Sequence, residues 1–322
     1  MKIDPMIKYL GILLLLLAPA AGLAQTAGYF GPLITLDNGK VTLQVSPKTG
    51  RIVSYQRTGE QNWLAVTDKP PIPGFPWNPW GGDRVWPTVQ SLNQQIYKSE
   101  GCDPVIDGQP WDLLSQTPAS LEMRSQISPQ LGLHITRRIK LVPDSTKVIH
   151  TFHLERIADS PFPVHVWTVT GIRPGNHIWI ESDPAIPHPD KKPFKWWRDS
   201  APSTEIPRAS LMETTRVLQV PLPAKSLKTG TYGRWIAAVN NTSAFLQTTA
   251  YHADALYLDA SNLQTYLSPQ YAIYEIETLS PTWFLRKGEC IEWKVQWQLL
   301  DFPSPAGTDK DKAEFLGFQL RK

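Results

Sequence analysis

The sequence predicts an all-β protein built from antiparallel strands. Thirty of the 322 residues are proline, against a usual share of about 5%, and proline interrupts helices. Short runs of alternating apolar and polar residues recur between turn residues, which is typical of strands. No segment carries an apolar stripe at the helical period for more than two turns. Together these observations indicate a large antiparallel β sandwich or barrel.

The expected strands follow one another along most of the chain. In the first hairpins, Val41, Leu43 and Val45 share one face, and the turn residues Asp37–Gly39 and Ser46–Gly50 flank them. In the fourth strand, Arg137 falls on the apolar face. The segments with this pattern are 34–36, 41–45, 52–55, 133–140, 164–170, 234–240, 245–249, 271–277 and 291–299.

Composition bounds the class of protein. Apolar residues make up 41% of the chain and charged residues 19%, so the chain can bury a sizeable core. The formal net charge is only +3. A strong field of one sign is therefore excluded, which argues against nucleic acid and anionic membrane surfaces as partners.

The first 24 residues have the features of a secretory signal peptide. Lys2 and Lys8 precede an apolar run, Leu10–Ala18, and small residues lead to Ala24. The run is shorter than the roughly 20 residues of a membrane-spanning helix. We therefore expect a periplasmic or secreted protein whose mature chain does not insert stably into a membrane. A retained membrane anchor is the alternative.

The remaining chain is expected to form one β-sandwich domain over residues 25–305, followed by a tail over 306–322. The charged residues Asp309–Lys312 are interpreted as a linker or loop. Export makes Cys102 and Cys290 candidates for a disulfide, and two separate reduced thiols are the alternative.

Two stretches rich in proline and tryptophan, residues 69–87 and 183–209, do not fit the strand pattern. They are too aromatic for flexible linkers, and long loops in compact domains are usually functional or disordered. We interpret both as ordered binding loops.

A pair of carboxylates marks the most informative strand. In 271–277, alternation places Glu275 and Glu277 about 7 Å apart on one face. Two like charges this close disfavour simultaneous ionisation, so one carboxyl can carry a raised pKa and move a proton. A solvent-facing polar stripe is the alternative interpretation.

The segment "IYEIETLSPTWFLRKGE", with the strand "WKVQWQL" after it, resembles the closing segment of galactose-mutarotase-like (aldose 1-epimerase) domains. That resemblance places Glu277 at the position of the family's catalytic base, and Lys287 replaces a turn proline. It implies a large antiparallel β supersandwich with a concave sugar-binding face.

Two further motifs support the resemblance over roughly residues 40 to 300. "WGGDRVWP" is similar to a binding loop of the hexose-phosphate branch. A Gly-Gly-x-Arg-x-Trp-Pro loop, a Lys-x-Gly step at Lys228–Gly230 and a Glu-x-Glu-Thr-Leu strand recur in this order in a branch of exported bacterial proteins whose function is not established. No cofactor is implied.

The chain departs from the family at its acid. The family's histidine, which protonates the sugar ring oxygen, aligns with Trp167 in "HVWTVT". His165 lies two residues earlier, on the same strand face, and could serve as the acid because histidine titrates near neutral pH. A packed structural histidine is the alternative.

The candidate binding residues combine indole rings with charged groups. Sugars stack their C–H faces on indoles and need polar partners at their edges. The glycines before Arg84 permit close approach of the backbone, and the guanidinium offers five donors. The expected substrate-binding residues are Arg84, Trp86, Trp80, Glu275, Lys228 and Trp167.

Other tryptophans, Trp77, Trp196 and Trp197, are secondary candidates, and loop-covered core is the alternative for all of them. No phosphate-binding loop, zinc-protease motif, cysteine-pair metal motif or nucleophile elbow appears in the sequence, so no metal site is expected. Three functions stay open: a sugar-binding module, an active mutarotase, and an envelope interaction scaffold without sugar affinity.

Overall fold

The computed structural model describes residues 28–67, 80–98, 102–182, 195–196, 210–212, 216–220 and 225–321. The expected signal peptide, residues 1–24, and the secondary candidates Trp77 and Trp197 lie outside these ranges. Trp196 is described only as backbone. Within the described ranges, no helix has the length and hydropathy needed to cross a membrane.

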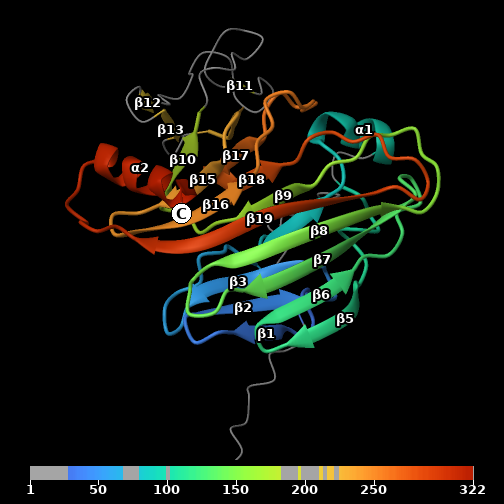
Figure 1. Cartoon of the computed structure of the whole chain (residues 1–322), viewed down its shortest axis with the longest axis horizontal. Helices are drawn as coiled ribbons and strands as arrows, with labels where there is room; N and C mark the ends of the chain where they lie inside the picture. The colour runs from blue at the N-terminus through green and yellow to red at the C-terminus, as the bar shows by residue number, and fades with distance from the viewer. Residues whose placement is uncertain are drawn as a thin grey trace, which may run out of the picture.

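Two antiparallel sheets account for most of the described chain and lie against each other as a sandwich (Figure 1). The first sheet has nine strands in the order β1-β2-β3-β4-β9-β18-β17-β14-β11. These are β1 (Ile34–Asp37), β2 (Val41–Ser46), β3 (Arg51–Arg57), β4 (Asp83–Trp86), β9 (Trp167–Gly171), β18 (Ile273–Leu279), β17 (Leu263–Ser268), β14 (Leu227–Thr231) and β11 (Lys195–Trp196).

The second sheet has ten strands in the order β12-β13-β10-β15-β16-β19-β8-β7-β6-β5. These are β12 (Ser210–Met212), β13 (Val217–Val220), β10 (His177–Glu181), β15 (Trp235–Val239), β16 (Ser243–Thr249), β19 (Cys290–Asp301), β8 (Val148–Arg156), β7 (Leu133–Leu141), β6 (Ser120–Arg124) and β5 (Asp112–Thr117). The all-β supersandwich expected from the sequence is confirmed.

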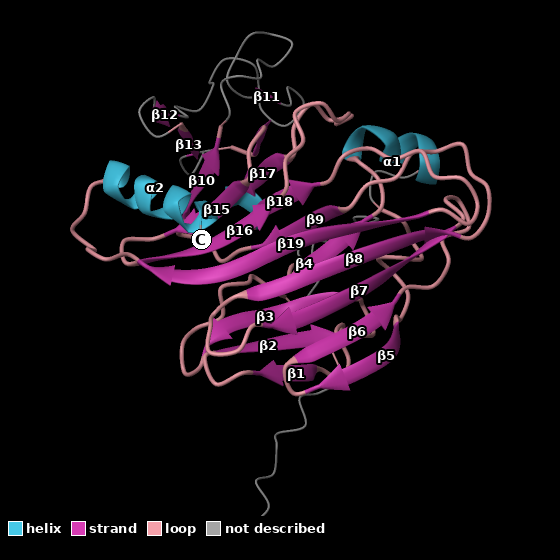
Figure 2. Ribbon diagram, viewed as in Figure 1, coloured by secondary structure: helices cyan, strands magenta, loops and turns pink. Residues whose placement is uncertain are grey.

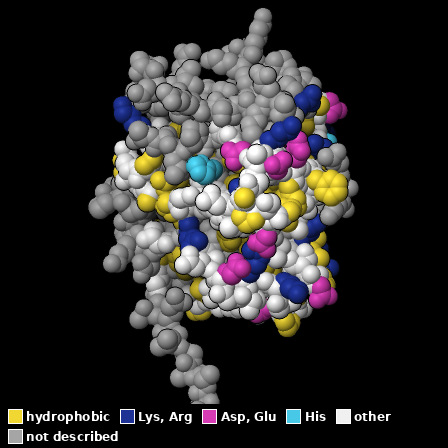
Figure 3. Space-filling model, turned by 90° about the vertical axis from the view of Figure 1, so that its left-hand side faces the viewer, with side chains coloured by type: hydrophobic (Ala, Val, Ile, Leu, Met, Phe, Trp, Pro, Cys, Tyr) yellow, Lys and Arg dark blue, Asp and Glu magenta, His cyan; other side chains and the backbone are white. Residues whose placement is uncertain are grey.

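Short helices accompany the two sheets. They are α1 (Gln90–Tyr97), α2 (Asp309–Phe318) and the 3-10 turns η2 (Pro269–Tyr271) and η3 (Gln319–Arg321). The two longest, α1 and α2, lie on the outside of the sandwich (Figure 2). Figure 3 shows one face of the molecule, on which basic, acidic and apolar side chains are mixed. This mixture agrees with the small net charge.

The main core fills the space between the sheets. The nine-stranded sheet contributes side chains such as Ile52 and Ile276, and the ten-stranded sheet contributes Phe152 and Trp297. Two smaller apolar clusters cover outer faces. One contains Trp86 and Trp167 with Leu92 of α1 packed against it, and the other joins α2 to β10, β15 and β16.

Most expected strands form, and the exceptions have local causes. The strand expected from residue 271 begins at Ile273, because Pro269–Tyr271 form a 3-10 turn and Ala272 adopts a left-handed conformation with φ 51°. The stretch 69–87, interpreted as a loop, contains β4. Strands β14 and β17 lacked a recognised pattern, because most of their residues are polar although they are buried, among them Lys228 and Gln264.

The charged segment Asp309–Lys312 is helical, so its interpretation as a linker or loop was wrong. A capping box between Thr308 and Asp311 starts α2. Ala313 and Leu316 then pack on the outer apolar cluster of the ten-stranded sheet. Phe315 also packs there, but charged residues occupy half of this short helix, so no long apolar stripe appears in the sequence.

The candidate Cys102–Cys290 disulfide does not form, since both cysteines are free, which is the alternative that the sequence left open. Cys102 is half-buried beside the outer cluster of Trp86 and Trp167. Cys290 is exposed at the first residue of β19, a strand of the other sheet. The two thiols therefore belong to different layers of the sandwich.

A buried ion pair joins the two sheets through the core. Arg137 of β7 bonds to Asp83 of β4, and both side chains are completely buried. Thr170 donates to the same carboxylate at 2.6 Å, and Gln247 donates to the Thr170 hydroxyl at 2.8 Å. The position of Arg137 on the apolar face of its strand, visible in the sequence, is thereby explained.

Removing one partner of this pair should be costly. We expect Asp83→Asn to lower the free energy of unfolding by about 3–5 kcal/mol, because it leaves the Arg137 charge buried and unpaired. Urea unfolding followed by circular dichroism measures the change. The matched control is Glu122→Gln, which breaks an ion pair with the largely exposed Arg138 and should cost at most about 1 kcal/mol. Equal effects of the two variants would contradict the structure.

The thiols should react separately. In the folded protein, we expect a thiol reagent to modify Cys290 first and Cys102 only slowly, because burial raises the pKa of the Cys102 thiol. Mass spectrometry under non-reducing conditions counts the alkylated cysteines. A protein with no free thiol before reduction would overturn this assignment.

Candidate functional site

Alternation along neighbouring strands brings the candidate residues to the outer face of the nine-stranded sheet. Trp86 of β4 pairs with Trp167 of β9, and Glu277 of β18 pairs with Val169 of β9. Ile276 and Tyr274 point into the core between the sheets, so Glu275 and Glu277 point outward. The face that the sequence predicted for the two carboxylates is therefore confirmed.

Glu277 is held by two side chains from neighbouring strands. Lys228 of β14 places its Nζ 3.0 Å from Glu277 Oε2 and 3.3 Å from Oε1. Trp167 Nε1 donates to Oε2 at 2.8 Å. The Glu277 side chain is only 1% exposed, and burial raises its pKa, with the nearby Glu275 adding to the rise and Lys228 and Trp167 opposing it.

Glu275 forms the second ion pair of the face. Arg84 Nη2 lies 2.9 Å from Glu275 Oε1, and the two side chains are 2% and 9% exposed. The Arg84 guanidinium also lies over the Trp86 ring at 4.7 Å from its centroid. Burial acts to lower the pKa of Arg84, but the negative charges of Glu275 and Asp107 outweigh it and raise the pKa overall.

Two indoles bring the ion pairs together. Trp86 and Trp167 meet edge to face with 4.9 Å between ring centroids, and Lys228 Nζ lies 4.8 Å from the Trp167 centroid. Six of the eight candidates therefore form one connected group. We call Arg84, Trp86, Trp167, Lys228, Glu275 and Glu277 the outer-face array. Its two cations and two carboxylates balance in charge.

The other two candidates lie apart from the array. His165 Nε2 shares a hydrogen bond of 2.8 Å with Thr282 Oγ1 rather than with Glu277. Burial lowers the pKa of His165 to about 3, so its imidazole is neutral near pH 7. Trp80 stacks on Tyr29 with 4.0 Å between ring centroids.

Trp80 lines a cavity of about 480 Å³ at the edge of the array. Glu275 of the array lines the same cavity, so the cavity reaches the array at this residue. The other lining residues are Leu64, Ala65, Val66, Thr67, Gly81, Gly171, Arg173, Pro174, Tyr271, Ala272, Ile273 and Tyr274.

The paired glycines before Arg84 serve the fold itself. Gly81 and Gly82 have φ values of 78° and 70°. A Cβ atom on Gly81 would lie 2.1 Å from the carbonyl oxygen of Ala65, and one on Gly82 would lie 2.5 Å from that of Ile52. The close approach expected from the sequence is therefore an approach to the protein's own backbone, which sets where β4 begins.

One polar residue of this sheet was missed in the sequence. Gln264 of β17 pairs directly with Glu277, and its Oε1 is buried without a hydrogen-bond partner among the described residues. Its Nε2 donates to Ser261 at 2.9 Å. No usable signal for Gln264 was available in the sequence, because the strand that contains it, β17, was not recognised.

Comparisons with known proteins identify the fold. No family model matches the chain, and no curated protein matches it. A galactose mutarotase-like protein from Lactobacillus casei is 11% identical, with a TM-score of 0.57 over 84% of this chain and 100% of that one. A candidate aldose 1-epimerase from Escherichia coli K12 is 12% identical, with a TM-score of 0.55 over 84% and 99% of the two chains.

A galactose mutarotase related enzyme from Lactobacillus acidophilus gives a TM-score of 0.53 at 11% identity, over 84% of this chain and 97% of that one. The similarity thus extends over nearly the whole length of each relative. Identities this low bear on architecture alone. The chain has the galactose mutarotase-like β-sandwich fold.

Proposed function

We propose that this chain is an exported carbohydrate-binding protein, periplasmic or secreted, that recognises a sugar at the outer-face array. The observation that carries the proposal is the convergence of two ion pairs, Arg84–Glu275 and Lys228–Glu277, with two indoles on one sheet face. The names of its structural neighbours, mutarotase-like and aldose 1-epimerase proteins, support a saccharide as ligand.

The chemistry of the array suits a sugar. A hydroxyl both donates and accepts, so a carboxylate and a cation side by side can each bond to one, and such charge-assisted hydrogen bonds are among the strongest in proteins. Indole rings offer flat apolar surfaces for the C–H face of the sugar. The cavity between Trp80 and Glu275 supplies space where a ring can contact both kinds of group.

Sugar recognition is favoured over mutarotation by the hydrogen bonds of Glu277 and by the neutral state of His165. Mutarotation needs a base for the anomeric hydroxyl and an acid for the ring oxygen. Both oxygens of Glu277 already accept from Lys228, and one of them also accepts from Trp167. His165, which could replace the family's acid, bonds to Thr282 and is neutral near pH 7, so it is a poor proton donor there. Active mutarotation is therefore the second candidate function.

Loss of Glu275 should weaken sugar binding. We expect Glu275→Gln to reduce the affinity for a bound sugar roughly tenfold, because a charge-assisted hydrogen bond becomes a neutral one. A glycan array identifies the ligand, and calorimetric titration measures the affinity. Glu292→Gln is the matched control, since Glu292 is an ion-paired glutamate on the other sheet. If the protein binds no glycan on the glycan array, the interaction scaffold without sugar affinity would be the better account.

The sugar identified with the glycan array also allows binding to be distinguished from mutarotation. We expect its anomers to exchange no faster with the protein than in buffer, which NMR exchange spectroscopy measures. Acceleration that disappears in Glu277→Gln would establish the mutarotase alternative instead.

His165 should stay neutral across the physiological range. An NMR titration should show its imidazole protonating only near pH 3, far below the 6.5 of an unperturbed histidine. Because the pKa is lower in the folded state, its contribution to stability is complete above pH 6.5 and is lost as the pH falls toward 3. In that window, unfolding of His165→Gln should depend on pH less steeply than that of the wild type, by up to about 1.4 kcal/mol per pH unit. A titration near pH 6.5 would restore His165 as an acid.

A further inference from the structure

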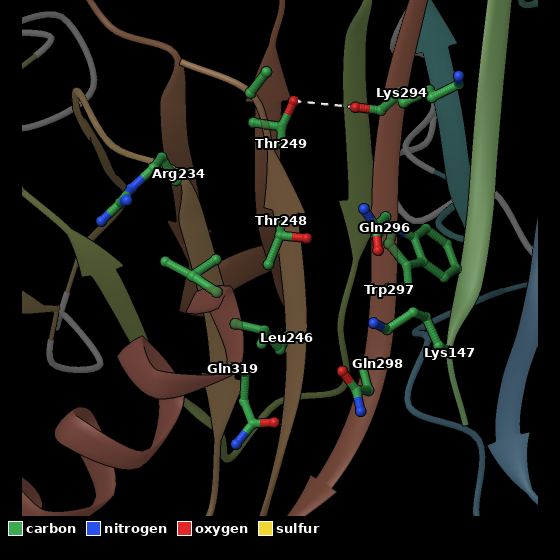
Figure 4. Close-up of a pocket in the computed structure, with 12 residues that line it drawn as sticks. Lys147, Arg234, Leu246, Thr248, Thr249, Lys294, Gln296, Trp297, Gln298 and Gln319 are labelled. Atoms are coloured by element: carbon green, nitrogen blue, oxygen red, sulfur yellow. Dashed lines mark hydrogen bonds between the residues drawn. The ribbon is translucent and has the colours of Figure 1, made fainter. Parts of the chain in front are cut away.

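A second cavity, of about 460 Å³, lies on the outer face of the ten-stranded sheet (Figure 4). Its volume falls within the range of small-molecule sites. We call it the β16–β19 groove, after the two strands that form its floor. The lining residues are Lys147, Arg234, Leu246, Thr248, Thr249, Ala250, Lys294, Gln296, Trp297, Gln298, Gln319 and Leu320.

Alternation explains why the floor is polar. Val295, Trp297 and Leu299 fill the core between the sheets, so Gln296 and Gln298 point to the outer face. Thr248 of β16 pairs with Gln296, and Leu246 pairs with Gln298. Leu246 and Trp297 are each only 1% exposed. The groove therefore offers a ligand the amides and the hydroxyl of its floor, together with apolar surface from the exposed Ala250 and the half-buried Leu320.

The charge of the groove is positive. Lys147, Arg234 and Lys294 line it, and no aspartate or glutamate does. Arg234 pairs with Glu181 at 2.6 Å and Lys294 with Glu292 at 3.0 Å, and both side chains point away from the middle of the groove (Figure 4).

Lys147 is the cation that faces the groove. Figure 4 shows its side chain reaching toward the strand that carries Gln296 and Gln298. It forms no ion pair within the part of the chain that the structure describes. A half-buried ammonium beside two amides is suited to a ligand that brings one carboxylate and several hydroxyl groups.

We propose that the β16–β19 groove binds an acidic oligosaccharide, with Lys147 on a uronate carboxylate and Gln296, Gln298 and Thr248 on ring hydroxyls. An amide side chain presents both a donor and an acceptor, which matches a hydroxyl. An acidic peptide fits less well, because the amides of Gln296 and Gln298 and the Thr248 hydroxyl match the many hydroxyl groups of a sugar more closely than they match peptide side chains. The site is separate from the outer-face array, which lies on the other sheet.

A titration with trigalacturonate, with maltotriose as the neutral match, tests the proposal on the full chain. Trigalacturonate should bind, maltotriose should bind at least tenfold more weakly, and backbone amide shifts should change in β16 and β19. Lys147→Met should weaken trigalacturonate binding roughly tenfold, the value expected for one charge-assisted hydrogen bond. Lys140→Met is the matched control, since Lys140 is an exposed lysine on the nearby strand β7, and it should leave binding unchanged.

Three results would overturn the proposal. They are equal binding by Lys147→Met and the wild type, shift changes confined to β14 and β18, and tighter binding of a triglutamate peptide than of trigalacturonate. Gln298→Ala serves as a second variant, so that a folding defect of one variant cannot decide the outcome. Both variants should unfold in urea as the wild type does.

Discussion

The short strand β4 is the constraint on which the site depends, because its two neighbouring charged residues face opposite sides of one sheet. Asp83 points inward and is tied to Arg137 of the other sheet, while Arg84 points outward to Glu275. The Asp83–Arg137 ion pair holds β4 against the other sheet, and Gly81 and Gly82 determine where the strand begins. A buried ion pair adds little net stability, but here it determines which way Arg84 can face.

Strand positions and strand faces could be predicted from the sequence wherever one face is buried and the other is polar. Strands β2, β7 and β19 show that alternation clearly. Strands β14 and β17 consist mostly of polar residues that are nevertheless buried, so their sequences carry no apolar pattern to detect. The start of β18 depends on one left-handed residue, Ala272, and a non-glycine residue in that conformation is not visible in a sequence pattern.

The membership of the site was more predictable than its bonding. Local alternation and the resemblance of the closing segment selected Glu275 and Glu277. The Gly-Gly-x-Arg loop and the Lys-x-Gly step added Arg84 and Lys228, and the sheet brings all four together. Which cation pairs with which carboxylate depends on the order of five strands, and no local pattern encodes that order. The separation of Cys102 from Cys290, and the bond from His165 to Thr282, are likewise consequences of tertiary packing.

Each charged group of the array already has an opposite charge beside it, and all six side chains of the array are buried. A sugar that binds at the array must break one of these ion-pair bonds before it forms its own hydrogen bond. Its net binding free energy is then a difference between two similar energies. Such an exchange of bonds gives a sugar modest affinity but sharp selectivity. A hydroxyl in the wrong orientation would leave a buried charged group without a partner, which costs free energy. The proposed sugar binding should accordingly be tested with methods that detect complexes of millimolar dissociation constant.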